Sequence, residues 1–455
     1  MLGYVGFLLL VLAQASSAQS VVNVTSLGAH SDGTNSAATT KAFQMAFASD
    51  PKGEIDIPSG TYLIDNSSGP LTINNFSGKL LFQGTAQLVF TNNTNGGLLF
   101  EGGSGALITG LRATYKTPPA FRNSPNEEIK FSRTMNTVLS DTVVQNSPAA
   151  GILFYGSFNP NVTNATVVNS LADGLNFSNC QNARVTNLVT KNTGDDGLAF
   201  VNYTQFPNLI GGLAQNIVIT NSKARGIAVA GQSNVTVNGF QIRSTSSSGV
   251  LVAQDTANHT RIPANVVIEN GTIYNAGTLA PLVGNQYGIE YNSQDSVTFT
   301  NISVFGSANN GLSGTSPGGS VTVKNVTVKS PLSGLGYLFY QTQKVQVTDS
   351  STDNSPSYGF LSLQSSLVIV RGLTVTNAGV TDTLKRAVWF ENARTILASA
   401  INIVSDAGTA NVIGCFTGPG YSATSGSVKA VTFSGKRGGS RLSTRNSCHN
   451  VIFSP

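Results

Sequence analysis

A period of 23 residues in the middle of the chain constrains the fold more than any other feature of the sequence. Gly151, Gly174 and Gly197 are 23 residues apart, and each is followed by a short apolar run. A fixed period of this length indicates a solenoid, in which each repeat packs only against its neighbours. The spacing recurs later in the chain, with longer gaps at about residues 201–212 and 253–264 where we expect inserted loops (Gly226 to Gly249, Gly288 to Gly311, Gly336 to Gly359).

Asparagines at a fixed distance before these glycines predict how the repeats stack. Stacked repeats would place their amides in register, where each amide can hydrogen-bond to the next in an internal ladder. The segments between them, such as residues 216–221 and 320–328, alternate apolar and polar residues as strands do. We therefore predict an all-β protein, a right-handed parallel β-helix. The asparagines that stand five residues before a period-marking glycine are Asn146, Asn169, Asn192, Asn221 and Asn354.

The N-terminal region predicts a leader and a cap. Residues 1–18 form a short apolar run that ends in small residues, which is typical of a secretory signal peptide and too short to span a bilayer. Residues 37–47 place Ala42, Phe43, Ala46 and Phe47 on one face of a helix, behind a cap at residue 35 or 36. We expect residues 19–455 to form one domain, with about 19–70 as the N-terminal cap.

The C-terminal region from about residue 414 to residue 455 predicts a second cap. It contains Cys415 and Cys448, for which we predict a disulfide bond, because a bridge that closes a loop of this size would stabilise the fold by roughly 3 to 4 kcal/mol in the chain-entropy model. Cys180 has no obvious partner and is predicted to be a buried small hydrophobic residue.

Composition excludes several partners. The net charge is +5 and is spread without a basic run, so we expect no nucleic-acid binding. No later apolar run predicts a membrane anchor, and we expect an extracellular, secreted monomer. Asn-X-Ser/Thr sequons agree with a secreted glycoprotein, and they include Asn23, Asn92, Asn161, Asn202, Asn258 and Asn325.

Three aspartates stand immediately before period-marking glycines. Asp173 precedes Gly174, and Asp195 and Asp196 precede Gly197. Because strands stack about 4.8 Å apart, Asp173 and Asp196 should be near neighbours, with Arg225 one coil further on. Carboxylates this close raise the pKa of one another, so that one can stay protonated as a general acid while another acts as a base. A single aspartate before glycine is commonly only a turn residue, but the cluster favours a catalytic site.

The N-terminal stretch Val22 to Gly33, the pair Ala42-Phe43 and the run Ile57-Pro-Ser-Gly-Thr-Tyr62 resemble the opening of polygalacturonases, glycoside hydrolase family 28, and of related pectate-lyase-like β-helix proteins. The resemblance implies that Asp195 is the general acid and that Asp173 and Asp196 activate water. This is an inverting mechanism, for which carboxyls some 6.5–9.5 Å apart are expected. It needs no obligatory cofactor or metal.

The chain departs from that family at two motifs. Ala224-Arg225-Gly226 stands where the family has Gly-His-Gly, and Leu251-Val252-Ala253 stands where it has Arg-Ile-Lys. The histidine and the basic clamp for a uronate carboxylate are therefore missing. We keep hydrolysis of a polysaccharide as the predicted reaction and leave the sugar open. The residues predicted to bind substrate are Arg225, Lys223, Tyr155 and Glu290.

Two other functions remain possible on the same fold. In a polysaccharide lyase or epimerase acting on uronic-acid polymers, the aspartates would hold Ca²⁺ and Lys223 or Arg225 would stand near the proton to be removed. Arginine is a poor base, because it is normally protonated. A non-catalytic glycan-binding protein would agree with the loss of the family's histidine and clamp.

Overall fold

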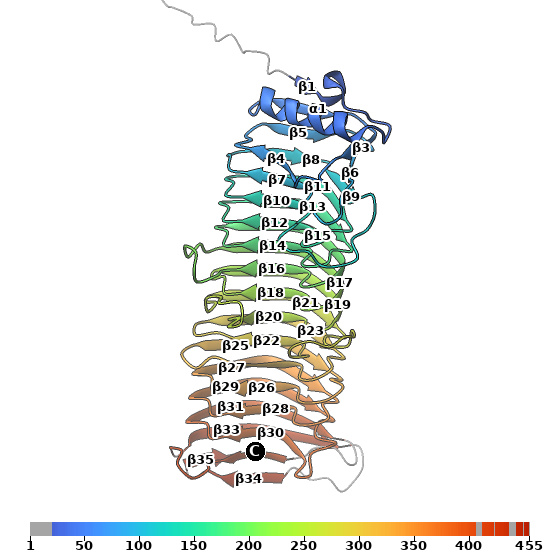
Figure 1. Cartoon of the computed structure of the whole chain (residues 1–455). Helices are drawn as coiled ribbons and strands as arrows, with labels where there is room; N and C mark the ends of the chain where they lie inside the picture. Colours follow the sequence, from blue (N-terminus) through green and yellow to red (C-terminus); the bar gives the residue numbers. More distant parts are fainter. Residues whose placement is uncertain (1–20, 406–411, 423, 436–442, 449, 455) are drawn as a thin grey trace, which may run out of the picture.

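The chain folds as a right-handed parallel β-solenoid of about 15 turns, with one short helix near the N-terminus, as predicted (Figure 1). The computed structural model describes residues 21–405, 412–422, 424–435, 443–448 and 450–454. The predicted signal peptide lies outside the described residues. No helix in these ranges is long and apolar enough to cross a membrane.

Two parallel sheets form the walls of the solenoid, and all named strand pairs in them are parallel. The first sheet carries the candidate site and contains β4 (Leu71–Asn74), β7 (Leu98–Glu101), β10 (Ile129–Ser132), β12 (Ile152–Tyr155), β14 (Leu175–Ser178), β16 (Leu198–Val201), β18 (Ile227–Ala230), β20 (Val250–Ala253), β22 (Ile289–Asn292), β24 (Leu312–Thr315), β26 (Tyr337–Tyr340), β28 (Phe360–Leu363), β30 (Arg386–Glu391), β32 (Val412–Phe416) and β34 (Ser443–Ser447).

The second sheet closes the coil on the other side, and its longer strands bend within each coil. It contains β1 (Val21–Asn23), β2 (Glu54–Ile57), β3 (Thr61–Ile64), β5 (Lys79–Phe82), β6 (Gln87–Phe90), β8 (Leu107–Thr109), β9 (Arg112–Tyr115), β11 (Val138–Gln145), β13 (Asn161–Val168), β15 (Ala183–Thr193), β17 (Gly212–Ser222), β19 (Val235–Thr245), β21 (Val266–Tyr274), β23 (Val297–Phe305), β25 (Ser320–Lys329), β27 (Lys344–Asp353), β29 (Leu367–Thr376), β31 (Thr395–Ser405), β33 (Ser425–Gly435) and β35 (Asn450–Phe453).

The period-marking glycines are required by close packing between coils. A Cβ atom on Gly174 would lie 2.5 Å from the carbonyl oxygen of Gly197 and 2.6 Å from Cγ2 of Thr190. Both distances are shorter than van der Waals contact, so a side chain at this point would push neighbouring coils apart. The 23-residue recurrence of glycine therefore follows from the lack of room for a side chain at the start of each strand of the first sheet.

Aromatic rings stack through the solenoid interior. Phenylalanines from β7, β10, β12, β14 and β16 occupy the same inward position, and successive ring centroids lie 4.4–5.6 Å apart. Buried rings in such contact add to the hydrophobic stabilisation of each coil. The stack holds β14 and β16 in fixed register, with Leu175 opposite Leu198. The five residues are Phe100, Phe131, Phe154, Phe177 and Phe200.

The predicted asparagine ladder exists, but it lies at an outer corner of the coil and not in the interior. Asn169, Asn192 and Asn221 each donate from Nδ2 to Oδ1 of the preceding asparagine at 3.0–3.1 Å, beginning from Asn146. All four have φ between 56° and 64°. This left-handed conformation, which asparagine tolerates well, turns the chain between the sheets and directs the amide outward.

The N-terminal helix α1 (Ser36–Ser49) packs over the first coils. Asn35 caps it by accepting a hydrogen bond from the backbone N of Ala38, and the predicted apolar face is buried. Phe43 contacts Tyr62 with ring centroids 5.6 Å apart, and Phe47 contacts Phe76 at 6.1 Å. The helix thereby shields the apolar interior at this end of the solenoid.

The cysteine predictions are confirmed. Cys415 and Cys448 form a disulfide bond in the last coils, and Cys180 is a buried free thiol. Burial raises the pKa of the Cys180 thiol to about 12, so it packs as a small apolar side chain.

The two inserted segments meet above the first sheet. The backbone N of Thr204 donates to the carbonyl of His259, and the backbone N of Arg261 donates to that of Asn202. The guanidinium of Arg261 also donates to the carbonyl of Phe206 at 2.8 Å. These bonds join both insertions into one wall. Asn202 is fully buried, so its sequon is inaccessible in the folded protein.

Candidate active site

Asp173, Asp195 and Asp196 converge, and we call them the acid cluster. Asp173 lies just before β14 and Asp196 takes the same position one coil later, before β16. One carboxylate oxygen from each of the three lies within 4.8 Å of the others. The nearest oxygens are therefore closer than the separation expected for an inverting pair with water between its carboxyls.

Short hydrogen bonds fix the two buried carboxylates. Oδ1 of Asp173 accepts from the backbone N of Asp196 at 3.0 Å, and Oδ2 accepts from Nδ2 of Asn176 at 2.6 Å. Oδ1 of Asp196 accepts from the backbone N of Arg225 at 2.9 Å. The Nε atom of Arg225 lies 3.0 Å from the same oxygen as an ion pair. Each coil thus positions the carboxylate of the coil before it.

Burial and mutual repulsion raise the pKa values of these groups. Desolvation and then the charge of Asp195 raise the pKa of Asp173 to about 6, against the opposing bond from Asn176. Desolvation raises the pKa of Asp196 well above its usual range, although Arg225 works in the other direction. The charge of Asp196 in turn raises the pKa of Arg225. The cluster can therefore retain a proton at mildly acidic pH.

Arg122 is a member of the site that the sequence did not reveal. It lies in the connection between β9 and β10, and its Nη1 forms an ion pair of 2.7 Å with Oδ2 of Asp195. The two residues are 73 positions apart, and no period or motif links them. Asp195 is the most accessible of the three acids. Its side chain is 27% exposed, against 5% for Asp196, and Asp173 is also buried.

The structure brings some of the other predicted residues to this site and not others. Arg225 contacts the acid cluster, and Tyr155 lines the adjoining cavity. Lys223 is exposed and lies outside the cavities described below. Glu290 lies on β22, three strands from β16, where it accepts hydrogen bonds from Ser248 and Asn285. Lys223 takes a different position within its coil, and Glu290 lies on a different coil, so neither reaches the acid cluster.

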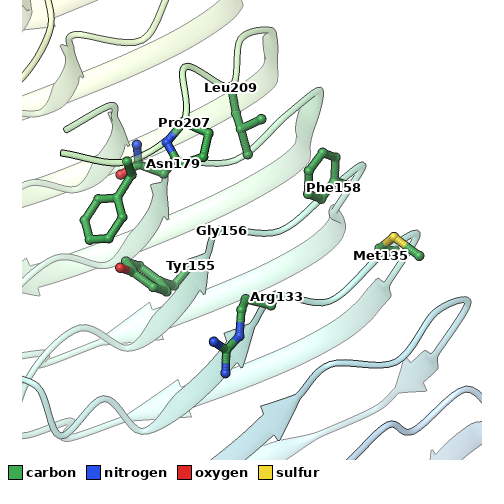
Figure 2. Close-up of a pocket in the computed structure, with 9 residues that line it drawn as sticks. Arg133, Met135, Tyr155, Gly156, Phe158, Asn179, Pro207 and Leu209 are labelled. Atoms are coloured by element: carbon green, nitrogen blue, oxygen red, sulfur yellow. The ribbon is translucent and has the colours of Figure 1, made fainter. Parts of the chain in front are cut away.

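Three adjoining cavities form a groove along the outer face of the first sheet. The cavity at the acid cluster has a volume of about 140 Å³ and shares Asp173, Asn176 and Tyr203 with a second cavity of about 290 Å³. The second shares Tyr155 with a third, of about 410 Å³, which is shown in Figure 2. An extended ligand could therefore contact all three.

The basic side chains along this groove are each paired with an acid. Besides Arg122 and Arg225 in the acid cluster, Lys130 pairs with Glu127 at 3.2 Å and Arg133 pairs with Glu101. A uronate carboxylate is normally bound by a cation that can form a charge-assisted bond to it. Here such a cation would first have to release its own carboxylate.

The comparisons with known proteins agree with the architecture. Residues 150–328 match a family model described as "Right handed beta helix region". No curated protein matches the chain by sequence. The fold is similar to the catalytic unit of a GH87 α-1,3-glucanase from Streptomyces thermodiastaticus strain HF3-3, with 19% identity and a TM-score of 0.58 over 96% of this chain and 71% of that one.

A second similar structure is the catalytic domain of a GH87 α-1,3-glucanase in complex with nigerose, with 15% identity and a TM-score of 0.53 over 88% of this chain and 66% of that one. Alanine variants of such a domain have also been solved. They replace two neighbouring aspartates and a third that precedes the first of these by 23 residues. At these identities the similarity establishes the fold.

Proposed function

We propose that this protein is a glycoside hydrolase that cleaves a neutral polysaccharide with Asp173, Asp195 and Asp196. The observation that carries the proposal is the convergence of their carboxylates within 4.8 Å at the floor of an open groove. Buried carboxylates repel one another and are costly to assemble, and a packed coil has no need of three. We expect the protein to act outside the cell as a monomer.

The proposed roles follow from the exposure of the three acids, since Asp195 is partly exposed whereas Asp173 and Asp196 are buried. Asp195 is the accessible acid and would protonate the glycosidic oxygen as the bond to the anomeric carbon breaks. Asp173, with Asp196 beside it to hold the water, would take the proton of the water that adds to that carbon. A base with a pKa of about 6, as burial gives Asp173, is suited to mildly acidic conditions.

Arg122 positions Asp195 in this scheme. Its Nη1 forms an ion pair of 2.7 Å with Oδ2 of Asp195, and both residues line the cavity at the acid cluster. The guanidinium therefore fixes how this carboxylate faces the cavity.

A neutral glucan is the preferred substrate class for two reasons. The groove cations are already paired with acids, so a uronate would have to compete with a resident carboxylate for each of them. The similar structures include α-1,3-glucanases, and their substituted aspartates have nearly the same sequence spacing as the acid cluster. α-1,3-Glucan is therefore the first polymer to test, beside polygalacturonate.

The lyase or epimerase function is supported by one feature, since three carboxylates this close could bind a cation. Ca²⁺ requires 6–8 oxygen ligands, and two of these three carboxylates already bind guanidinium groups. The raised pKa of Arg225 also opposes its use as a base. We therefore rank this function second.

The test incubates the purified protein with neutral and uronic-acid polysaccharides and measures new reducing ends and the ultraviolet absorbance of unsaturated uronates, with and without a chelator. Asp195→Asn should abolish reducing ends. Asp141→Asn is the matched control, because Asp141 is an exposed corner residue bonded to Asn164, where asparagine is tolerated. Absorbance that chelation removes would instead identify a lyase. The anomeric configuration of the first product, read by NMR, distinguishes inversion from retention.

A further inference from the structure

An apolar hollow with aromatic walls lies at the far end of the groove, and we call it the aromatic pocket. Figure 2 shows Met135, Tyr155 and Phe158 on one side and Pro207 and Leu209 of the first inserted loop on the other. Its volume is about 410 Å³, and Phe206 completes it by meeting Tyr155 edge-on, with ring centroids 5.5 Å apart. No acid of the cluster lines it.

The aromatic pocket is continuous with the site of cleavage. Tyr155 lines both this pocket and the middle cavity, which reaches Asp173. The acid cluster precedes the strands of the first sheet, whereas the pocket lies at their ends, a strand length of about 13 Å away. A single sugar unit bound over the acids would not fill it, but an adjoining part of the same polymer would.

We propose that the aromatic pocket is a binding subsite for an uncharged pyranose ring of the polysaccharide that is cleaved at the acid cluster. The inference rests on the proposed function and names a further subsite for the same substrate. A pyranose ring has an apolar face of C–H groups that packs on an aromatic ring while its hydroxyls remain in water. Tyr155 and Phe206 supply such rings in an open hollow, as carbohydrate binding requires.

The surrounding polar groups favour a neutral ring. The guanidinium of Arg133 pairs with Glu101, and the amide of Asn179 donates to Oδ1 of Asn202 and to the carbonyl of Tyr203. The amide of Asn179 is therefore fully used, and a carboxylate would have to compete with Glu101 for Arg133. The loop that carries Phe206 is held by the hydrogen bond from Arg261, so the wall is formed before the ligand arrives.

Phe158→Ala is the variant that tests the subsite. Phe158 is 38% exposed, so its truncation should leave the fold intact. Phe416→Ala is the matched control, because Phe416 is 39% exposed at the end of β32, many coils away. Affinity for α-1,3-linked gluco-oligosaccharides of graded length would be measured by calorimetry in the Asp195→Asn background, and kcat/KM in the active protein.

We expect Phe158→Ala to weaken binding of long oligosaccharides about tenfold, from the apolar contact removed, and to lower kcat/KM increasingly with chain length. The control should change neither. Equal affinity of Phe158→Ala and the control for every length would overturn the subsite even if hydrolysis is observed. Weaker binding by Phe158→Ala in a protein that cleaves nothing would retain the subsite and refute the hydrolase. Failure to bind any of these oligosaccharides would refute the subsite.

Discussion

Replacing Asp173 by asparagine should remove a measurable part of the pH dependence of folding. Asp173 is buried beside two other carboxylates, and its pKa is raised from an ordinary value of 3.8 to about 6. The folded state therefore binds more protons than the unfolded state between these pH values, and its stability falls as the pH rises. The difference in pKa corresponds to about 3 kcal/mol, present below pH 4 and lost by about pH 6.

The measurement is urea unfolding of the wild type and Asp173→Asn at steps from pH 4 to pH 7. The difference between their free energies of unfolding should change by up to about 3 kcal/mol in favour of the variant as the pH rises. Part of this change passes to Asp196, because removing one charge lowers the pKa of its neighbour. Asp141→Asn, at an exposed corner, should show no such trend.

A constant difference between wild type and Asp173→Asn over this range would refute the reasoning. It would mean that Asp173 titrates alike in the folded and unfolded states, and that neither burial nor its neighbours govern its proton. The proposed role of Asp173 as a base with a pKa matched to mildly acidic conditions would fall with it.

Three further results are expected. Arg122→Met should cost less than about 1 kcal/mol of stability, because the pair with Asp195 is partly exposed, but should lower kcat/KM by about tenfold or more, because Asp195 loses the ion pair that positions it; an unchanged kcat/KM would contradict this. Glu128→Met should stabilise the protein at pH 7 by at least about 1 kcal/mol, since burial raises the pKa of Glu128 and its oxygens have no hydrogen-bond partner; equal urea midpoints at pH 7 would contradict this. Replacing Cys415 and Cys448 by serine should cost about 3–4 kcal/mol in the chain-entropy model, seen as a lower melting temperature that reduction of the wild type reproduces.

The sequence could predict the fold because the constraint repeats in every coil. A Cβ at Gly174 would clash with the next coil, so glycine is required at this position of the coil. Because one coil takes 23 residues here, glycine recurs in the sequence at that interval. The asparagine ladder was predicted from the same spacing, but spacing alone does not say on which side of the backbone an amide lies. The left-handed φ of Asn169 and its neighbours places it outside.

The acid cluster could be predicted in part for the same reason. Asp173 and Asp196 occupy the same position on successive coils, and residues that do so recur in the sequence with the period of the coil. Arg122 could not be found, because it reaches Asp195 from a connection whose path no period sets. Glu290 was predicted to bind substrate, yet two strands, β18 and β20, separate its strand β22 from β16. The position of a residue within its coil could therefore be predicted from the sequence. Its distance along the solenoid axis could not, because the inserted loops change the number of residues in a coil.

The insertions that obscured the period also form one wall of the groove. Beneath Tyr203 the outward residues of β16 and β18 are small and buried, among them Ala199 and Ala228, and this lets the loops lie flat on the sheet. The loops meet through Arg261 and carry Phe206, whereas the acids belong to the regular coils. Because the two sets of residues are held by different contacts, changes in the loops can alter which polymer binds without moving the carboxylates. We therefore expect substrate preference to follow the loops and the reaction to follow the coils.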